Sequence, residues 1–247
     1  METKLNYKRT FLIGLAFLSI CSFWQMYDNI IPLILQNTYH LGETMTGAVM
    51  ALDNVLAIFL LPVFGTLSDK VHTKLGRRMP FIVSGTILAV IFMMLLPMID
   101  NAEKARWGTV ESFSNQVIFL AVLFFTLVSM GLYRSPAVAL MPDVTPNHLR
   151  SRANAVINLM GAVGGVYALI MIKVLVGKGE TPDYLPLFAS IAAVMAIAVG
   201  ILVMTIRENK LREEVEKAEA AIAETIEEKA MAEGVEAVGE IEAVGDT

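Results

Sequence analysis

Four ionisable residues interrupt long apolar stretches of this sequence: Asp28, Asp53, Arg134 and Lys173. A charge in such surroundings is costly, and it is therefore a functional candidate by default. A carboxylate in an apolar setting needs a cation or a proton beside it. We therefore predict that Asp53 pairs with Arg134 and can exchange it for H⁺ or Na⁺; a static structural ion pair is the alternative. Lys173 is expected to reach the surface with its long side chain.

Neutral polar residues accompany these charges. Ser22, Gln25 and Asn29 are spaced by three and four positions, so they share one helical face with Asp28. A polar stripe on an apolar helix is predicted to line a cavity, although Asp28 would stay in water if it lay near the outer surface. The candidate residues of a solute and cation pathway are Gln25, Asp28, Asn29, Asp53, Asn54, Arg134 and Asn158.

Aromatic and small residues add two further expectations. Trp24 and Tyr27 have rings that could stack on a sugar, but aromatic residues near the ends of apolar stretches more often anchor a helix at the membrane surface. Gly161 and Gly165 have the GxxxG spacing that lets one membrane helix approach another closely. Close packing alone explains these glycines, and no ligand is assigned to them.

The apolar stretches that carry these residues are long enough to cross a bilayer. The chain is 55% hydrophobic and only 17% charged, whereas soluble domains carry about 25% charged residues. A spanning helix needs roughly 20 apolar residues. Six stretches meet this length, at 10–35, 45–67, 79–98, 116–138, 152–175 and 185–206. The sequence therefore predicts an all-α membrane protein with six transmembrane helices.

The distribution of charge predicts the orientation. Twelve Lys and Arg residues fall on the side of the N-terminus and only three on the other, and such residues accumulate in cytoplasmic loops. Both termini are thus expected to be cytoplasmic, in a multi-pass protein of the cell membrane. Residues 1–206 would form the membrane bundle and residues 207–247 an acidic cytoplasmic tail. This tail has a weak heptad pattern, which suits either a solvated linker or a short coiled coil.

Other chemistries find little support. Cys21 is the only cysteine, so neither an internal disulfide nor a cysteine metal site can form. The three histidines have no partners at metal-binding spacing. No cofactor is expected apart from a coupling ion, H⁺ or Na⁺. No nucleic-acid partner is expected either, because the excess of negative charge lies in the tail and the basic residues mark loops.

The segment "GTLSDKVHTKLGRRMP", residues 65–80, carries a family resemblance. Its glycines, aspartate and arginines resemble the loop that joins the second and third helices in the major facilitator superfamily. The long gap before the second glycine is similar to the branch of glycoside–pentoside–hexuronide:cation symporters and sucrose-type carriers. A second stretch, "YRSPAVALMPDVTPNHLRSRANAVINLMG" at residues 133–161, resembles the region between the fourth and fifth helices of the sucrose-type branch.

The resemblance implies a conformational latch in the first of these loops. In the family, the loop holds one conformation of the carrier, and the matching residues here are Gly65, Asp69, Gly76, Arg77 and Arg78. Asp69 would pair with one of the two arginines. A partly solvated pair is worth about 0–1 kcal/mol, which suffices to bias conformations that differ by a few kcal/mol. The alternative is that the loop only sets the orientation.

The resemblance also implies a function. Members of the family have twelve spans in two halves, and this chain would supply the N-terminal half, with inverted three-plus-three repeats. The expected function is cation-coupled transport of a glycoside or a similar small polar solute, not enzymatic catalysis. The alternative is a non-transporting half or an assembly subunit. The expected partners are the lipid bilayer and a second six-helix chain; a homodimer is less favoured, because it would bring identical Asp53 and Arg134 groups together.

Overall fold

The structure is a computed structural model that describes residues 5–106, 113–177, 179 and 181–232. The described residues form helices and no strand. The elements are α1 (Tyr7–Asn37), α2 (Glu43–Met50), α3 (Leu52–Lys70), α4 (Met79–Lys104), α5 (Phe113–Asp143), the short 3-10 helix η1 (Asn147–Leu149), α6 (Arg150–Leu175), α7 (Leu185–Thr205) and α8 (Glu208–Ala232).

Six segments within the described ranges are long and apolar enough to cross a membrane, which confirms the predicted spans. Helices are the expected solution because each backbone N–H and C=O then finds its partner inside the segment. The second span contains two helices, since α2 and α3 follow one another with only Ala51 between them. The Ala51 N–H still bonds the Gly47 carbonyl, and the Val55 N–H bonds the Ala51 carbonyl, so the helical path continues.

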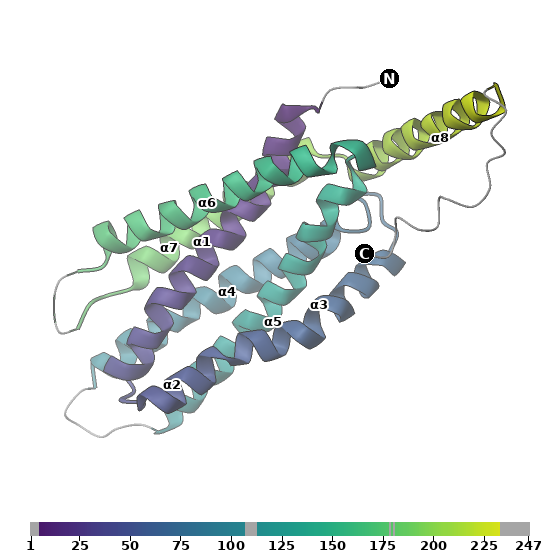
Figure 1. Cartoon of the computed structure of the whole chain (residues 1–247). Coiled ribbons are helices and arrows are strands. Elements are labelled where there is room, and N and C mark those ends of the chain that lie inside the picture. The colour runs from purple at the N-terminus through teal and green to yellow at the C-terminus, as the bar shows by residue number, and fades with distance from the viewer. Residues whose placement is uncertain (1–4, 107–112, 178, 180, 233–247) are drawn as a thin grey trace.

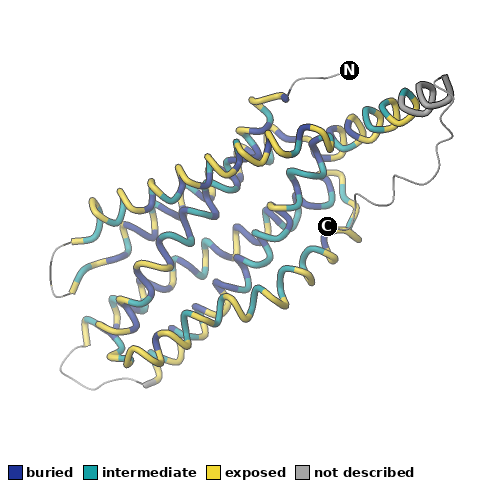
Figure 2. The backbone as a smooth tube through the Cα atoms, viewed as in Figure 1, coloured by how far each residue is buried: buried dark blue, intermediate teal, exposed yellow. Residues whose placement is uncertain are grey.

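Helix α1 lies at the centre of the bundle and the α2–α3 span lies at its edge (Figure 1). α1 packs against α6 and α7, α4 against α5 and α7, and α3 against α5. In α1, 56% of the most apolar window is buried; in the α2–α3 span the corresponding share is 0%. Figure 2 shows the same contrast, with buried positions along α1 and mostly exposed ones along α3. Residues on α1 are therefore held most firmly.

Glycines allow α6 to approach α1 very closely. Gly164 lies against the backbone of Leu18, where any side chain would overlap the Leu18 carbonyl. The Ser22 hydroxyl donates a hydrogen bond to the Gly164 carbonyl at 2.9 Å. A methyl group at Gly161 would lie 2.9 Å from the Cys21 Sγ, whereas Gly165 has 3.7 Å of room. The close approach predicted from the GxxxG spacing is present, but Gly164 rather than Gly165 makes its tightest contact.

The segment after the last span is helical where the structure describes it. α8 begins two residues after α7 ends and extends away from the bundle at the end where α1 begins (Figure 1). Its first two heptad positions, Leu211 and Val215, are 7% exposed. Leu211 joins the main apolar core. The start of α8 is therefore packed on the bundle, so packing does not change at residue 206. The division into a membrane bundle and a tail at this residue stays a prediction.

Candidate functional site

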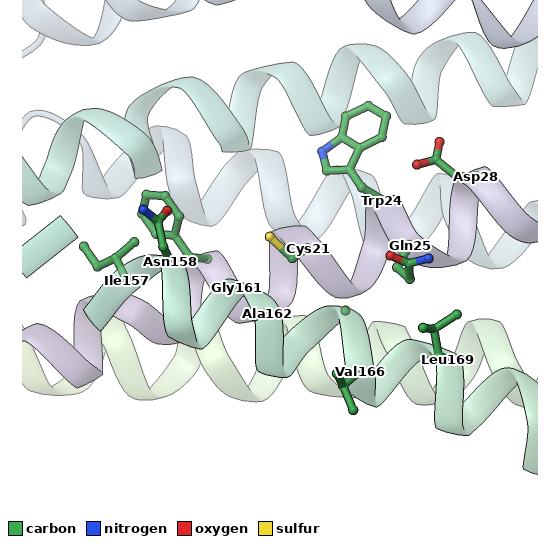
Figure 3. A pocket seen from close by; sticks show the side chains of 12 residues that line it. Cys21, Trp24, Gln25, Asp28, Ile157, Asn158, Gly161, Ala162, Val166 and Leu169 are labelled. Atoms are coloured by element: carbon green, nitrogen blue, oxygen red, sulfur yellow. The ribbon is translucent and has the colours of Figure 1, made fainter. Parts of the chain in front are cut away.

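Two pockets among the described residues bring predicted pathway residues together, and the larger of these two lies between α1 and α6 (Figure 3). It has a volume of about 430 Å³ and is open on one side. Three of the predicted pathway residues line it: Gln25 and Asp28 from α1, and Asn158 from α6. The close α1–α6 contact positions them, because it brings polar positions of two distant segments to one seam. An amide, a carboxylate and a second amide can together hydrogen-bond the hydroxyl groups of a small polar solute.

The other walls of this pocket come from small and aromatic residues. Cys21 and Trp24 contribute from α1, and Gly161 and Gly165 from α6. Few polar groups on largely apolar walls are the usual composition of a small-molecule site. The polar stripe predicted on the first span therefore does face a cavity, although not every member of it does.

Two members of the stripe lie elsewhere. Ser22 is buried in the α1–α6 contact, where its hydroxyl bonds two carbonyls, one of them from Gly164. Asn29 is exposed, and its side-chain amide donates to the Gln25 carbonyl at 2.7 Å. Sequence spacing alone cannot separate these roles, because all positions on one helical face share the same periodicity while the neighbouring helix covers only some of them.

A second, much smaller pocket lies between α1, α3 and α5. Asp53, Trp24 and Arg134 line it together with apolar side chains, and its volume of about 20 Å³ is enough for roughly one water molecule. The structure thus brings Asp53 and Arg134 to the same cavity from two distant segments. A space of this size next to a carboxylate suits a small cation or a proton.

Asp53 and Arg134 do not form an ion pair in this arrangement. The Arg134 guanidinium lies over the Trp24 ring, with 5.5 Å between its Cζ and the ring centroid. The Asp53 carboxylate accepts a hydrogen bond from the Asn54 side chain at 2.9 Å, and no salt bridge to it occurs among the residues described. The ion pair of Asp53 and Arg134, expected from their depth in the membrane, is therefore absent here. Arg134 contacts the Trp24 ring instead.

The five predicted latch residues meet where α3 ends and α4 begins. Asp69 lies 2.6 Å from the Arg78 Nη2 and 3.7 Å from the Arg77 Nη1. Arg78 also donates to the Gly65 carbonyl at 3.2 Å. The guanidinium of Arg78 is almost completely buried, whereas 48% of the Asp69 side chain is exposed. The predicted pairing of Asp69 is present, and its role as a latch stays a prediction.

Asp143 at the end of α5 completes this cluster. Its carboxylate lies 2.8 Å from the Arg77 Nη2 and 3.0 Å from the Arg78 Nε. Burial lowers the pKa of Arg77, but the hydrogen bond and the charge of Asp143, with the charges of Asp69 and Glu208, outweigh burial and raise it. Arg77 therefore stays charged, and the cluster joins three helices by charge.

Glu208, the first residue of α8, binds the start of α4 from the other side. Its carboxylate accepts backbone hydrogen bonds from Arg77 at 2.9 Å, from Arg78 at 3.0 and 3.1 Å, and from Met79 at 3.1 Å. These N–H groups open a helix and lack partners within it, and the helix dipole favours a negative charge there. Gly76, at φ +125°, leaves the space that this carboxylate fills.

A further charged cluster ties the opposite end of the bundle. The buried Asp100 accepts a hydrogen bond from Thr38 at 2.7 Å and pairs with Lys104 at 2.6 Å. Lys104 also donates to the Pro182 carbonyl and lies over the Tyr184 ring at 4.4 Å. Burial and the nearby Asp100 carboxylate raise the pKa of Tyr184. The ends of α1, α4 and the approach to α7 are thus fixed together.

Three residues of these charged clusters were not predicted from the sequence: Asp100, Asp143 and Glu208. Nothing local marks Glu208 or Asp100 as binding groups, because their partners are distant in the chain. Asp143 was part of the quoted resemblance but carried no assigned role. Its position at the end of a span was the available signal. Over the described ranges, no group of three His, Cys, Asp or Glu residues is arranged to hold a metal ion.

Comparison with known sequences identifies relatives. The sequence model of the Major Facilitator Superfamily matches residues 13–237. A sucrose transport protein of rice, Oryza sativa subsp. japonica, is 26% identical over 137 residues, which is 52% of this chain and 27% of the rice protein. A sucrose transport protein of Arabidopsis thaliana is 34% identical over 116 residues, or 44% of this chain and 22% of that protein.

A bacterial relative matches a similar stretch. An uncharacterized symporter of Synechocystis is 24% identical over 144 residues, which is 56% of this chain and 25% of the symporter. The matched part of this chain thus spans about a quarter of the length of these three relatives. The sequence resemblance and the six-helix fold agree with one another.

Proposed function

The chain belongs to the Major Facilitator Superfamily, and we propose that it forms the N-terminal six-helix half of a carrier for a glycoside or a similar small polar solute. The carrier would couple this transport to H⁺ or Na⁺ and would catalyse no chemical reaction. The observation that carries the proposal is the pair of adjoining pockets: Gln25, Asp28 and Asn158 line the larger one, and Asp53 and Arg134 the smaller one.

The two pockets suit the two tasks of a coupled carrier. The larger has room for a small polar solute and carries groups that bind hydroxyls. The smaller has space beside a carboxylate for one small cation. The names of the relatives support a sugar as solute and symport as the mode, since two are sucrose transport proteins and one is a symporter.

We further propose that transport needs a second six-helix unit. The larger pocket is open, so α1 and α6 would enclose a bound solute only in part. In carriers of this kind the site lies between two bundles that rock against one another. The exposed outer face of α3 offers apolar surface, including Ile58 at 70% and Phe59 at 65% exposure, to lipid or to such a unit. The cell membrane, with both termini in the cytoplasm, is the proposed location.

Uptake into proteoliposomes tests the proposal. The chain is reconstituted with and without a C-terminal six-helix unit of a related carrier, and radiolabelled sucrose is supplied under a Na⁺ or a proton gradient. We expect saturable, gradient-driven uptake only with both units. The Asp53→Asn variant should lose accumulation but keep exchange of sucrose across the membrane, because a neutral amide resembles the cation-loaded carboxylate. Full accumulation by this variant would exclude Asp53 as the coupling residue.

A further inference from the structure

Trp24 lies between the two pockets and lines both of them. Its indole ring projects from α1 on the side away from α6, while Cys21, Gln25 and Asp28 follow the same helix along the larger pocket (Figure 3). Any movement of this ring therefore changes the shape of both pockets at once.

The ring holds the basic residue of the smaller pocket. The Arg134 Cζ lies 5.5 Å from the Trp24 centroid, within the range of about 6 Å at which a cation is attracted to an aromatic face. Arg134 and Asp53 share the smaller pocket without a salt bridge between them. Arg134 thus has two alternative partners, the Trp24 face and the Asp53 carboxylate, and in this arrangement it takes the ring.

The same ring carries an unused hydrogen-bond donor. The Trp24 Nε1 is buried and has no hydrogen-bond partner among the residues described. The edges of Phe23 and Tyr27 pack against the ring at centroid distances of 5.3 and 5.4 Å, and neither supplies an acceptor. A buried donor without an acceptor is unfavourable, so this position of the indole carries a cost. The ring also lines the larger pocket, where a polar solute would bind.

We propose that Trp24 couples the two pockets. When a cation or a proton neutralises Asp53, Arg134 stays over the Trp24 ring and fixes the indole as part of the wall of the larger pocket. When Asp53 is charged and empty, Arg134 moves to it and leaves the ring. Trp24 is therefore a positioning residue in the cation pocket and a contact in the solute pocket. This inference rests on the proposed function of the two pockets.

The coupling is reciprocal by thermodynamic necessity. If neutral Asp53 favours the arrangement that binds solute, bound solute must favour neutral Asp53 by the same factor. Both sites then influence whether Arg134 contacts Trp24 or Asp53. A shared element with two positions is the physical requirement for coupling between sites. This relation turns the proposal into a measurement on Trp24 itself.

Fluorescence of Trp24 tests the first half of the proposal without any solute. The chain has two tryptophans, so the Trp107→Phe variant in nanodiscs reports on Trp24 alone. In this background we expect Asp53→Asn to shift the emission and to change acrylamide quenching, because Arg134 then stays on the ring. The shift should vanish when Arg134→Gln is added. Glu213→Gln, which removes an exposed carboxylate of α8, is the control and should leave the emission unchanged.

Two results would overturn the coupling. One is an Asp53→Asn variant with unchanged Trp24 emission. The other is a shift of equal size with Arg134→Gln present. Circular dichroism checks that each variant keeps its helix content, and Arg134→Met replaces Arg134→Gln in the cycle if the latter does not fold.

Equilibrium dialysis with radiolabelled sucrose, on the chain reconstituted together with a C-terminal six-helix unit of a related carrier, tests the second half of the proposal. In the Trp107→Phe background, Asp53→Asn should tighten sucrose binding about fivefold or more, at the lower end of typical coupling factors. Trp24→Leu should remove this gain, and Trp24→Phe, which keeps an aromatic face for Arg134, should retain part of it. A gain that persists in Trp24→Leu would refute the role of Trp24. If no variant binds sucrose, the proposed solute class fails, while the fluorescence cycle still decides the coupling within the smaller pocket.

Discussion

Single residues in the loop between α3 and α4 leave no room for a larger side chain. Gly76 has a φ of +125°, a conformation that side chains other than glycine rarely adopt. A Cβ at this position would also overlap the carboxylate of Glu208. The sequence resemblance selected Gly76 as a member of a motif, and the structure supplies the physical reason. The carboxylate of Glu208, from a different helix, occupies the space beside Gly76.

Gly76→Ala should therefore destabilise the protein by about 1–3 kcal/mol, through backbone strain and displacement of Glu208. Thermal unfolding in detergent measures the loss. Gly47→Ala is the matched control, because Gly47 lies inside α2 with nothing within 4 Å of an added Cβ. This control should be neutral or more stable by up to about 1 kcal/mol, since alanine is the better helix former. Equal effects of the two changes would contradict the requirement for glycine beside Glu208.

Glu208 is the other residue on which this end depends. Glu208→Ala leaves the N–H groups at the start of α4 without their acceptor, which costs about 1–3 kcal/mol for buried groups. We expect α8 to detach from the loop and to become more sensitive to trypsin at Lys210 and Arg212. Limited trypsin digestion of inside-out vesicles measures this. Glu224→Ala removes an exposed carboxylate of the same helix, distant from both cleavage sites, and should leave the digestion rate unchanged.

Pairs of helices carry the next level of organisation, and α1 with α6 is the pair on which the larger pocket depends. The approach is so close that the Ser22 hydroxyl reaches the Gly164 carbonyl. The sequence predicted a close contact from Gly161 and Gly165, yet Gly164 makes the tightest one. A GxxxG pattern identifies a face of a helix, but the crossing angle with the neighbour decides which glycine on that face touches its backbone.

Gly164→Ala should thus separate α1 from α6 and destabilise the bundle by about 1–3 kcal/mol, as overpacking of a tight contact does. Gly165→Ala should be tolerated, because a Cβ there keeps an ordinary distance of 3.7 Å from Gln25. Thermal unfolding of both variants in the same detergent compares them. A more severe effect at Gly165 than at Gly164 would show that the pattern, rather than the observed contact, describes the interface.

The helices themselves could be predicted from the sequence, whereas their partners could not. Length and hydropathy determine that a segment spans a bilayer, and all six spans follow from that rule. The contact of Arg134 with Trp24, in place of Asp53, depends on the relative rotation of α1, α3 and α5. Depth along each helix can be counted in residues, but rotation about its axis is set by packing with neighbours.

The whole molecule is held by charged clusters at its two ends and by apolar packing between them. At one end, Arg78 joins Asp69 and Asp143; at the other, Asp100 joins Thr38 and Lys104. Such an arrangement suits a bundle that moves as one body, since α4 takes part in both clusters and thereby links α3 and α5 to α1. Rigid-body movement against a second bundle is the motion that carriers of this kind require.

The orientation of the molecule can be tested with single cysteines in a Cys21→Ser background. Ala105→Cys and Gly179→Cys place exposed thiols at the end that we expect to face outward, and Lys74→Cys places one at the opposite end. An impermeant thiol reagent added to intact cells should label the first two and spare the third. Labelling of the third position alone would reverse the proposed topology.

The reactivity of Cys21 can report on the larger pocket in the unaltered protein. It is the only cysteine in the chain, and it lines the larger pocket. The rate at which a small thiol reagent consumes it therefore reports how often that pocket opens and to which side, with no engineered label. An occupant that fills the pocket would slow the reaction in proportion to its residence there. The extent of modification of Cys21 can thus be followed by mass spectrometry in native membranes as a measure of access to the larger pocket.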